Sequence, residues 1–392
     1  MENPLSRFAA VHLTRDGSAM FVLVDGRAFT ADLGAPMFEP TSVIESSTHL
    51  PQSSMLRLRT NRGDDIIVEL PSPDDLAPLR DRPSIYLDQN HWSTLAKTIH
   101  EPARVPNPHE RTAAEKLIEL ARAQRILLPM SSAHMGETSQ QSNYEQRYQR
   151  ALTIAQLSGG WQFRDPLSLR QFELRRTFTE RYRHDHLEPL AAVTLAPDVI
   201  HEGRGTSHHP VGLDLPPAMQ FVTRVLSSIT SSIDTMLDLE PCQLESVAAW
   251  ASGFQETATI FRDHPVGPEM RRRRTYMKFI VDLGKELALA SFQSGITPQE
   301  MSRWIMSHGE EDIRTMPALG LFREVLHEKL SDNKLQWKEN DLIDMMYLTA
   351  AAGYCDHVVG ERAHTSHIVN SARRLGRTIS LHRTLRSLVD QL

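Results

Sequence analysis

The chain has 392 residues, of which 40% are hydrophobic and 23% are charged, and its formal net charge at pH 7 is −6. This composition is typical of a globular protein with two or three domains and a well-buried core. The acidic balance excludes a protein that covers nucleic acid with its whole surface, although a confined basic channel remains compatible with it.

The cysteines and the apolar segments indicate the compartment. Cys242 and Cys355 lie far apart without a partner spacing, which indicates neither a zinc site nor a disulfide framework and fits a reducing environment. The first seven residues open no continuous apolar segment, so we expect no signal peptide. No run approaches the roughly 20 apolar residues of a membrane span. The sequence therefore predicts a cytoplasmic protein without a membrane segment.

Residues 1–80 are predicted to form a small β-rich domain, either a sheet or an open barrel. Short β-prone runs are separated by turn sequences such as Asp16-Gly17 and Asp25-Gly26. The runs are residues 8–13, 19–24, 28–33, 55–59 and 65–70. Pro71-Ser72-Pro73 and Pro78 predict a linker after them. This domain carries no recognisable chemistry and is a candidate surface for a protein partner.

Residues 81–145 alternate between apolar runs and helical patterns. Ile85-Tyr86-Leu87 predicts a buried strand that ends at Asp88-Gln89-Asn90, and residues 126–130 predict a second strand. Asn107-Pro108 and Ser131-Ser132 predict the starts of two helices. Strand and helix in this rhythm predict an α/β fold with a parallel sheet. Ligands of such sheets bind beyond the carboxyl ends of the strands, where Asp88 lies, although Asp88 could instead cap the following helix.

Long helices are predicted to dominate residues 146–329, which we interpret as a helical insertion. Their helical spacing covers residues 146–157, 167–183, 219–239, 244–261 and 270–292. Residues 196–217, rich in Pro, Gly and His, predict a long exposed loop.

Residues 330–392 return to the α/β pattern. Residues 340–353 predict a helix that Asn340 caps and Gly353 stops. A strand over residues 355–359 ends at Gly360-Glu361-Arg362, and a helix over 367–375 and a strand over 378–381 follow.

Acidic residues occupy comparable places in these predicted elements. Asp88 and Glu361 each follow a strand, Glu137 lies in the first turns of a helix, and Asp341 begins another with Asp344 on the same face. Parallel strands place their carboxyl ends, and the N-termini of the following helices, at one edge of the sheet. Carboxylates gathered there repel one another unless a cation neutralises them, and oxygen ligands favour Mg²⁺ or Mn²⁺ over zinc. Such a site supports phosphodiester hydrolysis.

The order and context of these residues resemble the PIN-domain family of metal-dependent nucleases. The resemblance rests on four segments: residues 85–88, residues 127–132 with Glu137, residues 340–353 and residues 357–362. It covers roughly residues 81–145 and 330–392, and it implies a PIN-like three-layer α/β/α sandwich that cleaves RNA with Mg²⁺ or Mn²⁺, leaving a 5′-phosphate. Bacterial members often act as toxins or defence effectors. Two features depart from the family: Glu361 stands where an aspartate is usual, and the insertion is far longer than a minimal member would have.

Other residues have a functional and a structural interpretation. Asp344 could be a ligand, a supporting carboxylate or an exposed helix residue, and Asn90 could bind water or phosphate or form an Asx-turn. Trp92 could stack on a base or belong to the core. Four adjacent arginines, Arg271 to Arg274, could contact phosphates, with Arg271 and Arg272 as the candidates, or form a solvated, carboxylate-paired face. The same holds for the basic helix with Arg170, Arg175, Arg176, Arg181 and Arg183, and His364 and His367 could approach phosphate.

The sequence thus predicts a metal-dependent nuclease, most simply an endoribonuclease, with DNA as the other polymer to consider. Asp88, Glu137, Asp341 and Glu361 are its catalytic and metal-binding candidates, and Asp344 is a fifth ligand candidate. The alternative is a PIN-like scaffold without catalysis that binds RNA or a protein. A phosphohydrolase of small molecules is a third reading, and a homo-oligomer is compatible with each.

Overall fold

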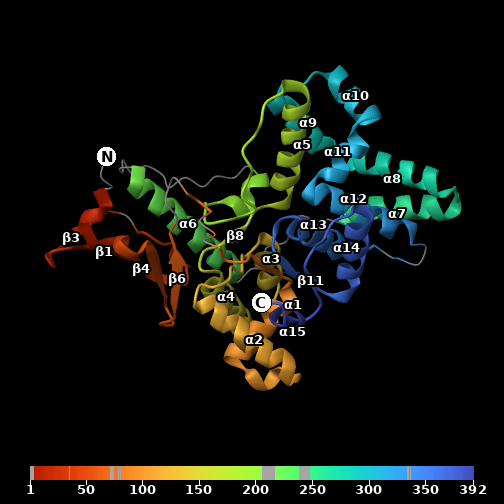
Figure 1. Ribbon diagram of the computed structural model, residues 1–392. Coiled ribbons are helices and arrows are strands. Elements are labelled where there is room, and N and C mark those ends of the chain that lie inside the picture. Colours follow the sequence, from red (N-terminus) through yellow and green to blue (C-terminus); the bar gives the residue numbers. More distant parts are fainter. Residues whose placement is uncertain are drawn as a thin grey trace. The chain divides into compact units, whose positions relative to one another are not determined.

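The computed structural model describes residues 4–34, 36–70, 75–77, 79, 81–204, 217–237, 248–332, 335 and 337–392. The chain is mixed α/β: a six-stranded antiparallel sheet comes first, and a mostly helical region with a small parallel sheet follows (Figure 1). The contacts divide it into two compact units. Unit 1 comprises Met1–Ser84, Gln89–Phe163 and Val193–Cys242, and unit 2 comprises Ile85–Asp88, Arg164–Ala192 and Gln243–Leu392.

The antiparallel sheet in unit 1 confirms the predicted β-rich start. Its strand order is β3-β2-β1-β4-β5-β6. The strands are β1 (Phe8–Thr14), β2 (Ser18–Leu23), β3 (Ala28–Asp32), β4 (Ile44–Leu50), β5 (Met55–Thr60) and β6 (Asp65–Glu69). Ile44, Leu56, Leu58, Ile66 and Val68 are at most 1% exposed and form its core face. The prediction missed β4 because its sequence, IESSTHL, is too polar to show a β-prone run.

Helices α1 to α4 and α6 complete unit 1. They are α1 (Gln89–His100), α2 (Pro108–Arg122), α3 (Ser132–Ser139), α4 (Tyr144–Ser158) and α6 (Pro217–Leu237), with short pieces β8 (Gln162–Phe163), β9 (Val193–Thr194), η1 (Pro4–Arg7), η2 (Pro51–Ser53), η3 (Pro102–Arg104) and η4 (Val199–Arg204). The predicted caps Asn107 and Ser131 are confirmed. The predicted strand over residues 126–130 is reduced to single parallel bridges, Ser84 with Leu127 and Met130 with Gln162. Pro129 interrupts the ladder because it has no N–H to donate.

Unit 2 combines the parallel sheet with most of the helices. Its sheet has the order β11-β10-β7 and contains β7 (Ile85–Leu87), β10 (His357–Val359) and β11 (Leu381–His382). The helices are α5 (Pro166–Arg183), α7 (Ala248–Asp263), α8 (Pro268–Asp282), α9 (Gly284–Ser294), α10 (Pro298–Ser307), α11 (Gly309–Thr315), α12 (Pro317–Ser331), α13 (Glu339–Tyr354), α14 (Arg362–Leu375) and α15 (Leu385–Val389). The single helix predicted over residues 270–292 was wrong. It is broken at buried Leu283, and Gly284, a poor helix former, begins the second part.

Helix α13 differs from its prediction at both ends. Its N-cap is Lys338, not Asn340, and the Lys338 backbone N–H donates to Asp341 Oδ2 at 3.0 Å. Gly353 does not stop the helix, which continues to Tyr354. A Cβ at Gly353 would lie 2.7 Å from the carbonyl carbon of Pro317, so the glycine instead allows α13 to approach the start of α12.

Part of the predicted exposed loop over residues 196–217 is buried. Ala196, Val199 and Ile200 are at most 7% exposed, the last two of them in η4, and residues 205–216 lie outside the described residues. Also outside them are the linker residues 71–73 and Pro78, Cys242, and residues 238, 239 and 244–247 of two predicted helices. In the described part of the chain, no helix is both long and apolar enough to cross a membrane. The division at residues 80, 145 and 329 stays a prediction.

Candidate active site

The parallel sheet of unit 2 places two of the predicted acids at one edge. Leu87 at the end of β7 is paired with Val359 at the end of β10. Asp88 follows directly, and its backbone N–H donates to the carbonyl of Val359 at 2.9 Å. Gly360 N–H in turn donates to the carbonyl of His382 at 3.0 Å, and Glu361 comes next. Both acids therefore emerge at the carboxyl edge of the sheet, as predicted for a ligand-binding position.

The carboxyl group of Asp344, on α13, interacts electrostatically with the other acids. Burial, followed by the charges of Asp88, Asp341 and Glu361, raises the pKa of its carboxyl group to about 7, against the opposing effect of Lys329. Asp88, Asp341 and Glu361 therefore lie within electrostatic range of Asp344 in unit 2. These four are among the five predicted metal ligands, and their role as ligands stays a prediction. At neutral pH, such an arrangement retains a proton on one carboxyl group or binds a cation.

Lys329 supplies one positive charge to this group. The Lys329 side chain is 3% exposed, and its Nζ lies 4.0 Å from Asp341 Oδ1 and 5.2 Å from the ring centroid of Trp337. Burial lowers the pKa of the Lys329 ammonium, and the charges of Asp341 and Asp344 oppose this change. Lys329 is not among the residues predicted from the sequence, because its role depends on the packing of α12 against α13, for which the local sequence has no signal.

His364 on α14 also contacts the acids. Its Nε2 lies 3.4 Å from Asp344 Oδ2, so the histidine predicted to approach phosphate is held against a carboxylate. Burial lowers the pKa of His364, and the charge of Lys329 acts in the same direction. His367 instead contacts Glu328, with Nδ1 2.8 Å from Oε1.

The spacing of the acids differs from that of a finished metal site. Among the residues that the structure describes, no three His, Cys, Asp or Glu side chains are grouped so as to hold a metal ion. The donor chemistry nevertheless suits Mg²⁺ or Mn²⁺, because all four candidate groups are carboxylates. An ion would require these side chains to turn toward one point. Lys329 offsets part of the charge of Asp341 and Asp344.

Glu137 and Asn90 belong to unit 1. Glu137 lies on α3, where its charge opposes the lowering of the Arg150 pKa that burial causes. Its association with Asp88 therefore stays a prediction. Asn90 is exposed in the first turn of α1, and its carbonyl accepts from Thr94 Oγ1 at 3.0 Å. Trp92 is fully buried with its ring 5.9 Å from that of His134, which confirms that it belongs to the core.

Most of the predicted basic residues are paired with carboxylates. Arg272 contacts Glu324, which is fully buried, and lies 3.8 Å from Glu310. Arg170 is 3% exposed and lies 2.9 Å from Glu286. Arg176, Arg181 and Arg183 pair with Glu180, Asp312 and Glu300, respectively. These pairs correspond to the structural interpretation of the basic runs.

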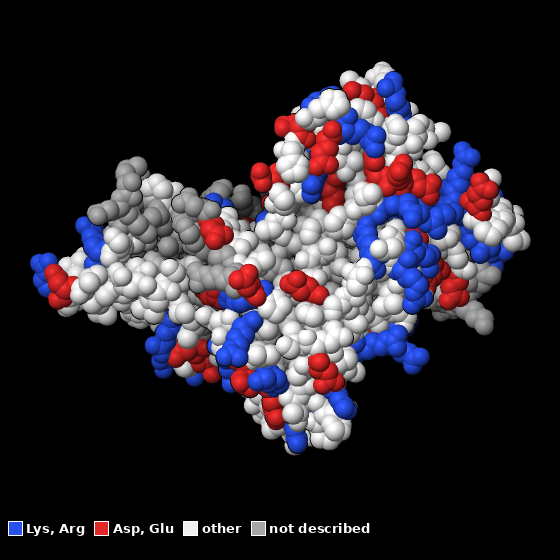
Figure 2. Space-filling model, in the orientation of Figure 1, with Lys and Arg blue, Asp and Glu red and all other residues white. Residues whose placement is uncertain are grey.

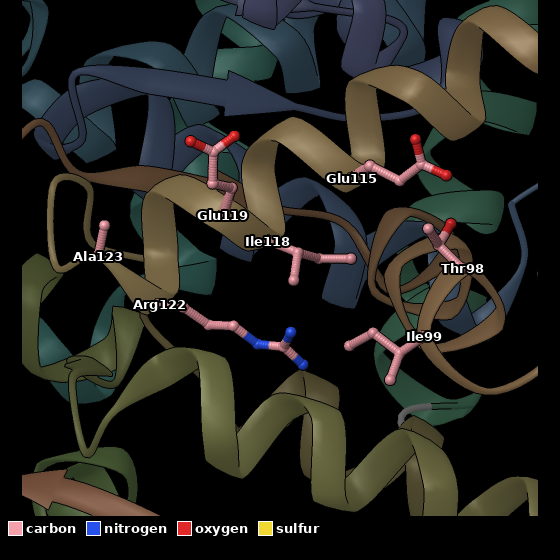
Figure 3. A pocket seen from close by; sticks show the side chains of 7 residues that line it. All are labelled: Thr98, Ile99, Glu115, Ile118, Glu119, Arg122 and Ala123. Carbon is pink, nitrogen blue, oxygen red and sulfur yellow. The ribbon is translucent and has the colours of Figure 1, made fainter.

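The face drawn in Figure 2 shows Lys and Arg side chains gathered over α8, α12 and α14. There, Arg272 and Arg374 line an open depression of about 360 Å³ together with His327 and Glu328. A larger hollow of about 610 Å³ lies in unit 1 between α1 and α2. Figure 3 shows Ile99, Ile118 and Arg122 turned toward this hollow. None of the predicted site residues lines it.

No known protein family, curated protein or solved structure was found to match this chain.

Proposed function

We propose that the chain is a metal-dependent nuclease that hydrolyses phosphodiester bonds, with RNA as its substrate. The observation that supports this most is that Asp88 and Glu361 follow paired strands of a parallel sheet and, with Asp341, lie within electrostatic range of Asp344. Their order along the chain also underlies the PIN-domain resemblance and the three-layer sandwich it implies, which we include in the proposal.

Each residue has a distinct part in this proposal. Asp88, Asp344 and Glu361 would hold Mg²⁺ or Mn²⁺, with Asp341 beside Lys329 and Glu137 as a further candidate. When bound, the ion supplies Lewis-acid activation of water and stabilises the charge of the phosphate. Lys329 holds Asp341 in place by its charge, and His364 Nε2 faces Asp344 Oδ2, where it can share a proton with the carboxyl group. Phosphate guidance would come from arginines of unit 2 such as Arg271, whereas Arg272 is already paired with Glu324.

The test combines ion binding with cleavage. EDTA-treated protein should bind Mn²⁺ in calorimetry and cleave single-stranded RNA in its presence, with single-stranded DNA tested in parallel. Asp88→Asn should reduce cleavage by a factor of at least about 100, because a ligand is lost while the side-chain size is kept. Asp356→Asn is the matched control. Asp356 is an exposed acid that directly precedes the first residue of β10, whereas Glu361 follows the last residue of this strand. Equal activity of the two variants would contradict the proposal.

The second candidate is a scaffold without catalysis that binds RNA. The absence of a ready three-ligand group among the described residues and the buried Lys329 ammonium favour it. This scaffold would bind RNA without Mn²⁺ and cleave nothing, and Asp88→Asn would leave its RNA affinity unchanged.

A further inference from the structure

Two histidines and a serine form a close group on the parallel sheet of unit 2. His357 Nδ1 lies 2.8 Å from Ser380 Oγ and 3.4 Å from His382 Nε2, and Ser380 Oγ lies 3.0 Å from His382 Nε2. Val359 is the pairing partner of His382, so His357, two residues before it on β10, projects from the same face. The three polar atoms therefore form a triangle that joins β10 to β11.

The separation of the two ring nitrogens matches the spacing of metal ligands better than a hydrogen bond. Hydrogen bonds from nitrogen usually span about 2.7–3.2 Å. Two imidazole nitrogens, each about 2.0–2.1 Å from a tetrahedral zinc ion, lie about 3.3–3.4 Å apart. The observed separation of 3.4 Å between His357 Nδ1 and His382 Nε2 agrees with this spacing of two zinc ligands. Ser380 Oγ would add an oxygen donor to the two ring nitrogens, and water would complete a four-coordinate site.

The state of His382 suits a ligand. Its side chain is 4% exposed, and burial, followed by the charge of His357, lowers its pKa. Neutral imidazole is the form that binds metal ions. The backbone of Ser387 opposes this pKa change.

The group of His357, Ser380 and His382 is partly open to solvent. His357 and Ser380 are half-buried, and Ser380 Oγ lies 3.3 Å from Oε1 of the exposed Gln391. An ion therefore need not cross the core to reach the two rings.

We propose that His357 and His382, assisted by Ser380, bind a transition-metal ion of the Zn²⁺ class, separate from the carboxylate group. The ion links β10 to β11 and fixes the last segment of the chain to the sheet. Its two nitrogen ligands distinguish it from the oxygen-only acids, which favour Mg²⁺ or Mn²⁺. This site does not depend on the nuclease proposal.

The test is a Zn²⁺ titration of tag-free, EDTA-treated full-length protein in excess Mg²⁺, which keeps the carboxylates occupied. One Zn²⁺ should bind per chain and raise the melting temperature. His357→Asn should weaken binding at least about 10-fold, and since His357 is half-buried this variant should fold. His382→Asn should have the same effect, with near-ultraviolet circular dichroism to confirm folding.

Two controls separate this site from others. His109→Asn removes an exposed histidine on α2 and should leave Zn²⁺ binding unchanged. Asp88→Asn should also retain Zn²⁺ binding. The proposal fails when the original protein binds no Zn²⁺ under these conditions, when His357→Asn binds it as tightly as the original protein does, or when Asp88→Asn abolishes the binding.

Discussion

The Lys329 ammonium lies almost fully buried beside carboxylates and forms no hydrogen bond among the described residues. It therefore stabilises the neighbouring carboxylates through its positive charge. Removing one partner of a buried ion pair leaves the other charge uncompensated in a medium of low dielectric constant. A bound divalent ion can supply the missing charge. Lys329 and a metal ion therefore have overlapping roles in the proposed site, and the two can be separated by measurement.

We expect Lys329→Gln to lower the free energy of unfolding by about 3 kcal/mol at pH 8 in EDTA, because Asp341 and Asp344 lose their counter-charge. Excess Mn²⁺ should restore most of this loss if the acids bind the ion. Urea denaturation with and without Mn²⁺ measures both effects. Lys116→Gln is the control, since Lys116 pairs with Glu119 at the surface, where such pairs contribute little. Equal losses in the two variants would contradict the assigned role of Lys329.

His49 gives a pH dependence that is independent of the acids. Burial lowers the pKa of its imidazole from 6.5 to about 4. Because the pKa is lower in the folded state, the stabilisation is complete above pH 6.5 and is lost as the pH falls toward 4. The full difference is about 3 kcal/mol. His49→Gln should therefore flatten the decrease in stability between pH 7.5 and 4.5, measured by urea denaturation, whereas His109→Gln controls for replacing an exposed histidine. A parallel decrease in the original protein and in His49→Gln would exclude this origin.

Individual site residues differ in how far the sequence could predict them. Asp88 and Glu361 could be predicted as candidates because each follows a short apolar strand. Asp341 and Asp344 could be predicted because their spacing places them on one helix face. Lys329 lies at the end of α12, and nothing near it in the sequence indicates the acids it meets. Pairing between distant segments decides such a role, so local patterns cannot predict it.

At the scale of elements, helical spacing and caps predicted most helices, and errors arose where packing overrides propensity. Gly353 is the clearest case. A glycine near a helix end suggests a stop, yet here the missing side chain makes room for Pro317. The same residue type thus has a packing role that only the structure shows.

Gly353→Ala should destabilise the protein by about 2 kcal/mol, since the new Cβ would meet backbone atoms that cannot rotate away. Gly284→Ala is the matched control. Gly284 begins α9, and nothing lies within 4 Å of an added Cβ. This change should be neutral or add about 0.4–1 kcal/mol through the unfolded chain. Thermal and urea unfolding of both variants measure the change in the free energy of unfolding. A Gly353→Ala variant as stable as the original protein would show that α12 and α13 can move apart with little loss of stability.

At the scale of the whole molecule, the two compact units are built from segments that alternate along the chain. The chain passes between the two units after residues 84, 88, 163, 192 and 242. Asp88 lies in a four-residue segment of unit 2 between two stretches of unit 1. A sequence pattern predicts elements along the chain, but the return of the chain to an earlier unit depends on long-range contacts, such as those of α6.

We therefore predict that a fragment of residues 1–163 folds poorly, whereas 1–242 forms a cooperative unit 1. Helix α6 packs on α3 and α4, and Asp234 accepts from Ser42 Oγ at 3.0 Å and from the Val43 backbone N–H at 3.2 Å. Without α6, the apolar faces that cover Ile229, Ile233 and Met236 would meet water. The shorter fragment should show a broad urea transition and the longer one a sharp transition, although the longer fragment also carries α5, which belongs to unit 2. Equal cooperativity would mean that α6 is dispensable for unit 1.

Adding residues 243–392 to the longer fragment would then test whether Asp88 and the later acids can assemble from two chains, with Mn²⁺-dependent RNA cleavage as the measurement.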